Sequence, residues 1–180
     1  MPNFLTLVRI ALVPALIVLL LSSFRGHEFA ALSVFLVASL TDTVDGFLAR
    51  RNNKITTLGQ LLDPIADKLL ITSAIICLVQ SRAVAAWIAI VIIGREIAVT
   101  GLRAIAASKG VIIPASWPGK IKMTLETITI SFLILGKGIL GKLSIIGDIG
   151  LWLVLASAVY SAGDYFIKYG PRLLFERSEP

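Results

Sequence analysis

The chain has 180 residues, of which 57% are hydrophobic, and its mean hydropathy is +0.90. This composition excludes an ordinary soluble domain of the same size and predicts an integral membrane protein. The formal net charge of +6 is dispersed among apolar segments rather than gathered on one polar face, which argues against a protein that binds nucleic acid.

Six apolar segments follow one another along the chain, each close to the ~20 residues that a helix needs to cross ~30 Å of hydrocarbon. The connections between them are short and polar, and no internal repeat or linker divides the chain. We therefore expect an all-α, polytopic membrane bundle of six transmembrane helices that forms a single domain over residues 1–180. The predicted spans are Phe4–Ser22, Phe29–Ala49, Leu61–Val79, Ala83–Ile105, Ile121–Ile139 and Leu143–Tyr165.

The first apolar segment is expected to be a retained helix rather than a cleaved signal peptide. It lacks a basic region before the apolar run, and Arg9 lies inside it. If both termini are cytoplasmic, most of the 17 lysine and arginine residues fall in inside-facing regions. The positive-inside tendency then places the end of the second helix and the start of the third at the cytoplasmic face of the cell (inner) membrane. We expect the active site at these cytoplasmic ends.

Four aspartates, with small residues and one arginine between them, lie at the junction of the second and third segments. On a helix advancing about 100° per residue, the members in the second segment share one face. Those in the third segment are spaced i, i+4, i+8, so they also form one stripe, provided that the third helix starts near Thr56 or Thr57. The two stripes would then bring four carboxylates together across the intervening turn. The cluster consists of Asp42, Asp45, Gly46, Ala49, Arg50, Gly59, Asp63 and Asp67.

Four carboxylates at a membrane interface require cations. Because no histidine or cysteine lies nearby, the donor set favours a hard divalent ion such as Mg²⁺ or Mn²⁺, with room for one or two. Such ions bridge phosphate oxygens, and Arg50 can pair with a phosphate through two parallel hydrogen bonds. The pattern predicts a metal-bound diphosphate as substrate.

This spacing resembles the signature of the CDP-alcohol phosphotransferases, which move a phosphatidyl group from a CDP-activated lipid to an alcohol and release CMP. The resemblance implies six transmembrane helices, a homodimer, and the use of two metal ions per site. It also implies roles by position. Asp42, Asp45, Asp63 and Asp67 would bind metal, Asp67 would also be the catalytic base, and Asn3, Thr6, Gly46, Ala49, Arg50, Thr56 and Gly59 would contact or accommodate the CDP-lipid.

The second half of the chain bears on the acceptor alcohol. The stretches 94–97, 102–103 and 116–122 resemble the bacterial phosphatidylglycerophosphate synthases, which implies CDP-diacylglycerol and glycerol 3-phosphate as substrates. Arg95 is a charge within an apolar span, where a functional role is the default expectation. Arg95, Arg103 and Lys120 are the predicted ligands of an acceptor phosphate.

Several alternatives stay open. Arg95 could instead pair with Glu96 or Glu126, and Lys122 could be a snorkelling residue. Whether Lys122, Lys68 or Arg51 contribute to substrate binding is undecided. The acceptor could be that of a phosphatidylserine, inositol-phosphate or cardiolipin synthase. A membrane prenyltransferase would also bind a metal-diphosphate through aspartates, but it does not explain the small residues and the arginine between the carboxylates. A divalent-cation transporter would line a through-pore with aspartates rather than cluster them at one face beside a guanidinium.

Overall fold

The computed structural model describes residues 2–52, 57–109 and 117–175, with side chains described within 6–41, 65–109 and 121–169. All regular structure in these ranges is helical, as the sequence predicts. The elements are α1 (Pro2–Leu21), α2 (His27–Asn52), α3 (Thr57–Gln80), α4 (Ala86–Ser108), α5 (Trp117–Leu140), the 3₁₀ turn η1 (Gly141–Ser144) and α6 (Ile145–Phe175).

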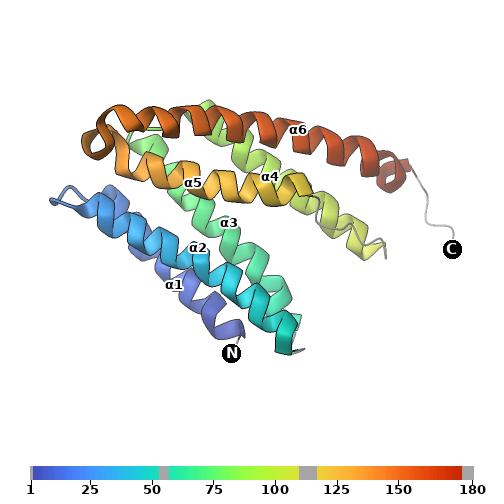
Figure 1. Cartoon of the computed structure of the whole chain (residues 1–180). Helices are drawn as coiled ribbons and strands as arrows, with labels where there is room; N and C mark the ends of the chain where they lie inside the picture. The colour runs from blue at the N-terminus through green and yellow to red at the C-terminus, as the bar shows by residue number, and fades with distance from the viewer. Residues whose placement is uncertain (1, 53–56, 110–116, 176–180) are drawn as a thin grey trace.

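The helices run alternately up and down the bundle. Figure 1 shows the start of α1, the end of α2 and the start of α3 on one side of the molecule, and the end of α4 and the end of α6 reach the same side. The turn between α1 and α2 and the η1 turn lie at the opposite end. The predicted condition that the third helix begins near Thr57 is confirmed, because α3 begins at this residue.

Apolar side chains from all six helices form the core. Helix α1 packs against α2 and α3, α6 packs against α4 and α5, and α2 contacts α5 and so joins the two groups. One cluster of buried residues runs through the whole bundle, and it includes Leu16, Phe35, Leu70, Ile92, Leu133 and Val154. Close packing of these side chains helps to hold the helices together, because dispersion contacts between them are numerous.

The outside of the bundle is also apolar. Ile90 is 70% exposed, Trp152 58% and Ile167 77%, among many other large hydrophobic side chains. By length and composition alone, one helical stretch of the described residues, Ile121–Tyr169, is apolar and long enough to cross a membrane. Thr6–Leu21 and His27–Thr41 are shorter apolar stretches. The six-span topology and the single domain therefore stay predictions.

One predicted span is interrupted. Helix α5 has a non-helical backbone at Gly136, with φ 62° and ψ −176°, before the predicted end of this span at Ile139. Glycine tolerates this positive φ because it has no Cβ. The break lets the chain enter η1 and return as α6, which packs along α5. Gly150 makes this packing close, because a Cβ there would lie 2.5 Å from Thr129 Oγ1.

Candidate active site

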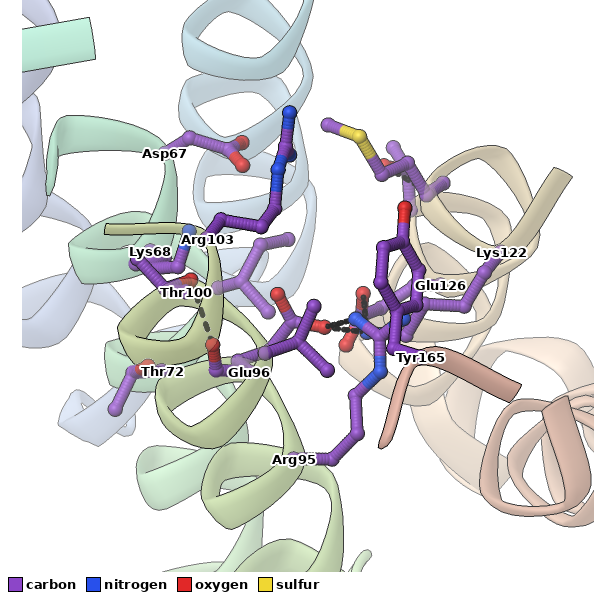
Figure 2. A pocket seen from close by; sticks show the side chains of 14 residues that line it. Asp67, Lys68, Thr72, Arg95, Glu96, Thr100, Arg103, Lys122, Glu126 and Tyr165 are labelled. Atoms are coloured by element: carbon purple, nitrogen blue, oxygen red, sulfur yellow. Dashed lines mark hydrogen bonds and ion pairs between the residues drawn. The ribbon is translucent and has the colours of Figure 1, made fainter. Parts of the chain in front are cut away.

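A pocket of about 170 Å³ lies among α3, α4, α5 and α6. Polar and charged side chains from all four helices converge on it, as Figure 2 shows. Helix α3 brings the last aspartate of the predicted signature, and α4 brings two of the three predicted acceptor ligands. The charged and hydroxyl-bearing residues that line the pocket include Asp67, Lys68, Arg95, Glu96, Arg103, Lys122, Glu126 and Tyr165.

Asp67 and Arg103 lie at one side of this pocket. Asp67 is part-buried on α3, Arg103 is exposed on α4, and the two side chains point toward one another in Figure 2. Arg95 and Arg103 are eight residues apart on α4 and both line the pocket, as their spacing predicts. A carboxylate and two guanidinium groups thus face the same space.

Four charged residues form a continuous network beside them. Arg95 Nη1 donates to Glu96 Oε1 at 2.5 Å, and Lys122 Nζ donates to the same Glu96 oxygen. Lys122 Nζ also lies 3.0 Å from Glu126 Oε2. Arg95 Nη2 donates to Ser161 Oγ at 2.5 Å. We call Arg95, Glu96, Lys122 and Glu126 the charge cluster; together with Ser161 it links α4, α5 and α6.

The charge cluster is strongly desolvated and formally neutral. The exposed fraction is 1% for the Lys122 side chain and 5% for that of Glu126. Removing such charges from water is costly, and their pairing offsets much of that cost. The pairing of Arg95 with Glu96 was one of the two alternatives that the sequence left open. The interpretation of Lys122 as a snorkelling residue is wrong, because its ammonium group is buried between two carboxylates.

Sequence reasoning assigned no site role to Lys122, Glu96, Glu126 or Tyr165, all of which line the pocket. One signal could have indicated the first and third of these. Lys122 and Glu126 are spaced i, i+4 within an apolar span, where two opposite charges favour pairing with each other. Lys68, whose contribution was undecided, also lines the pocket.

Most predicted metal ligands lie outside the described side chains. Asp42, Asp45 and Asp63 belong to α2 and α3, whose backbones contact one another, but the placement of their side chains is not described. Among the described residues, no group of three histidine, cysteine or acidic side chains could hold a metal. The described member of the predicted set, Asp67, fits a hard divalent ion, because it presents carboxylate oxygens to the pocket.

Most of the predicted CDP-lipid contacts also lie outside the residues whose side chains the structure describes. Thr56 lies outside the described residues, and the side-chain surroundings of five other helical positions are not described; these are Asn3, Gly46, Ala49, Arg50 and Gly59. The same holds for Arg51 and for the predicted acceptor ligand Lys120. Thr6 is described and is completely buried. Arg9, one turn later, is 1% exposed, and its Nε donates to Ala38 O at 3.2 Å, which ties α1 to α2.

Comparison with known proteins gives one consistent result. The family model described as CDP-alcohol phosphatidyltransferase matches residues 1–160. A CDP-diacylglycerol–glycerol-3-phosphate 3-phosphatidyltransferase of Bacillus subtilis (strain 168) is 41% identical, with 93% of this chain and 94% of that protein covered. The protein of the same name from Rickettsia felis is 38% identical, with 92% and 93% covered. A probable phosphatidylglycerophosphate synthase of Mycobacterium tuberculosis (strain H37Rv) is 35% identical, with 92% and 79% covered.

Proposed function

Because the chain belongs to the CDP-alcohol phosphatidyltransferase family, we propose that it transfers the phosphatidyl group of CDP-diacylglycerol to glycerol 3-phosphate. The products are phosphatidylglycerophosphate and CMP, and the reaction is a step in phospholipid synthesis. The observation that carries this proposal is the pocket among α3, α4, α5 and α6. It places a carboxylate of the signature, Asp67, in the same space as Arg95 and Arg103.

Asp67 is the proposed general base. Its carboxylate takes the proton from the primary hydroxyl of glycerol 3-phosphate, and the hydroxyl oxygen attacks the phosphorus that carries diacylglycerol. The bond from this phosphorus to the CMP oxygen breaks, and CMP leaves with the electron pair. Such a positioned base contributes typically 10²–10⁴-fold to a rate. No covalent enzyme intermediate is needed, because the attack and the departure occur at the same phosphorus.

Asp42, Asp45, Asp63 and Asp67 are the proposed ligands of two Mg²⁺ or Mn²⁺ ions. Divalent ions bound there would neutralise charge on the diphosphate and on the departing phosphate oxygen. Asn3, Thr6, Gly46, Ala49, Arg50, Thr56 and Gly59 are the proposed CDP-lipid positions. The arginine among them can hold a phosphate oxygen pair, and the glycines and alanine leave space for the nucleotide.

Arg95, Arg103 and Lys120 are the proposed ligands of the acceptor phosphate. Arg103 is exposed at the side of the pocket where Asp67 lies, so it can meet a phosphate that arrives from water. Arg95 lies deeper, with a side chain that is 9% exposed. Holding the phosphate at these groups would leave the primary hydroxyl of the same molecule free to approach Asp67. Lys120 lies in the first turn of α5.

We also propose that all six helices span the cell membrane, with the aspartates at the cytoplasmic face, and that the protein is a homodimer. Helix α1 has 20 residues and α6 has 31, and α5 is continuous over residues 117–135 before its break at Gly136. At 1.5 Å per residue, α1 and the continuous part of α5 are each about 30 Å long, which is the thickness of the hydrocarbon core. The exposed apolar side chains on the outside of the bundle support this placement.

An acceptor screen tests the proposal. The purified protein is given CDP-diacylglycerol, Mg²⁺ or Mn²⁺, and one acceptor at a time, and CMP release is measured. We expect release with glycerol 3-phosphate and far less with glycerol, serine or inositol phosphate. Asp67→Asn is the matched control, because it keeps the side chain's size but cannot take the proton. Equal release with an acceptor that lacks a phosphate would refute the assignment of the acceptor.

A further inference from the structure

Arg95 and Lys122, which line the pocket with Asp67, are already paired with a carboxylate, that of Glu96. The same oxygen of Glu96, Oε1, accepts from Arg95 Nη1 at 2.5 Å and from Lys122 Nζ. A phosphate offers these donors the same kind of acceptor, an anionic oxygen that makes short charge-assisted hydrogen bonds. The carboxylate therefore occupies the position that a phosphate oxygen would take between an arginine and a lysine.

The two carboxylates of the charge cluster differ in their freedom to move. The Glu96 side chain is 22% exposed and borders the pocket, whereas the Glu126 side chain is 5% exposed. Glu96 can therefore turn toward water when its partners are taken, while Glu126 stays against Lys122. The cations themselves are fixed, because Arg95 Nη2 is held by Ser161 Oγ on α6 and Lys122 is 1% exposed.

The guanidinium of Arg95 also keeps an unused donor. Its Nε is buried and has no hydrogen-bond partner among the side chains and backbone groups that the structure describes. A buried donor without a partner is costly, so a ligand that supplies an acceptor gains from satisfying it. A phosphate has more acceptor oxygens than the carboxylate that it would replace.

We propose that Glu96 is an internal counter-anion, which neutralises Arg95 and Lys122 in the empty enzyme and is displaced from them by the phosphate of the acceptor. This inference rests on the proposed function, and it adds Lys122 to the groups that bind the acceptor. It also gives a basis for specificity. An alcohol without a phosphate cannot replace the carboxylate, so the cations stay occupied and the alcohol is not held beside Asp67.

Replacing Glu96 with glutamine tests the proposal, because the amide keeps the size of the side chain and removes its charge. The apparent KM for glycerol 3-phosphate should fall about tenfold, with little change in kcat. A tenfold change corresponds to a binding free energy near the lower end of the range for one hydrogen bond to a charged group. Glu96→Asp keeps the charge and should stay closer to the wild type. Asp148→Asn, which removes a carboxylate paired with Lys137 outside this pocket, should leave KM unchanged. A higher KM in Glu96→Gln would show that Glu96 positions the cations and would overturn the proposal.

Thermal unfolding gives a readout that is independent of turnover. Without its counter-anion, the Glu96→Gln protein should be less stable than the wild type, and glycerol 3-phosphate or inorganic phosphate should raise its Tm by more than it raises that of the wild type. If the variant cannot be purified, adding inorganic phosphate during purification should restore folded protein. A phosphate-induced shift no larger than that of the wild type, or no rescue by phosphate, overturns the proposal. Failure of the proposed function is distinguishable, because wild-type protein would then release no CMP with glycerol 3-phosphate.

Discussion

Replacing Lys122 with methionine should be among the most destabilising changes at the pocket. Lys122 is 1% exposed and serves two carboxylates, Glu96 and Glu126, the second at 3.0 Å. Methionine has a similar length and no charge, so the substitution removes the ammonium group without opening a large cavity. The formally neutral cluster then carries one excess negative charge, in a place from which Glu126 has almost no access to water.

The size of the effect follows from this burial. Breaking a buried ion pair by removing one partner costs about 3–5 kcal/mol, because an uncompensated charge stays behind. For a chain of this length, 1 kcal/mol corresponds to roughly 2–4 °C, so the expected loss is about 6–20 °C in Tm. The double variant Lys122→Met/Glu126→Leu should recover a large part of this loss, because Arg95 and Glu96 then remain as a neutral pair at 2.5 Å.

The assay is thermal unfolding of the purified protein in lipid nanodiscs, followed by tryptophan fluorescence. Lys168→Met is the matched control. Its ammonium group lies 2.7 Å from Asp164 Oδ1, but the side chain is 62% exposed, so no measurable change in Tm is expected. Equal Tm values for Lys122→Met and Lys168→Met, or a double variant less stable than Lys122→Met, would refute the view that the charge cluster depends on mutual compensation.

Four further predictions follow from the site and the packing. Asp67→Asn should lower kcat by roughly 10²–10⁴-fold while CDP-diacylglycerol still binds, as measured by CMP release and by nucleotide-lipid binding; a variant with full turnover would exclude Asp67 as the base. Arg103→Ala should raise the KM for glycerol 3-phosphate more than it lowers kcat, and an unchanged KM would remove it from the acceptor site. Chelation of divalent ions should abolish CMP release, and added Mg²⁺ or Mn²⁺ should restore it; activity that persists in the chelator would contradict the metal assignment. Gly150→Ala should lower the free energy of unfolding by about 1–3 kcal/mol, as measured by thermal unfolding, because the added Cβ would lie 2.5 Å from Thr129 Oγ1. Gly163→Ala should be close to neutral, because a Cβ added there meets no neighbouring group within 4 Å.

The helical architecture was accessible from sequence because long apolar runs interrupted by polar turns have few structural solutions. The predicted span Phe29–Ala49 lies within α2, His27–Asn52, and the condition that the third helix starts near Thr56 or Thr57 is met by α3, which begins at Thr57. The break at Gly136 was not predicted, because a glycine in an apolar run does not by itself indicate a change in backbone direction. The position of this break depends on how α5 packs against α6 and the η1 turn.

The candidate site was accessible only in part. The spacing of Asp42 to Asp67 identified the family, since these residues are close in sequence and share helix faces. The charge cluster joins Arg95, Lys122 and Ser161, which come from three different helices. Such pairings depend on how the helices pack, and sequence periodicity within one helix does not report that. For this reason the sequence left open whether Lys122 is a snorkelling residue, and the structure shows it buried between two carboxylates.

The central claim is that the alcohol joined to the phosphatidyl group is glycerol 3-phosphate. Purified protein should be incubated with CDP-diacylglycerol and glycerol 3-phosphate labelled at its phosphate, and both the label in the lipid fraction and the CMP released should be counted. The account predicts one labelled lipid molecule for each CMP, and roughly 10²–10⁴-fold slower formation of both products with Asp67→Asn. CMP released without label in the lipid, or label incorporated without CMP, would contradict it.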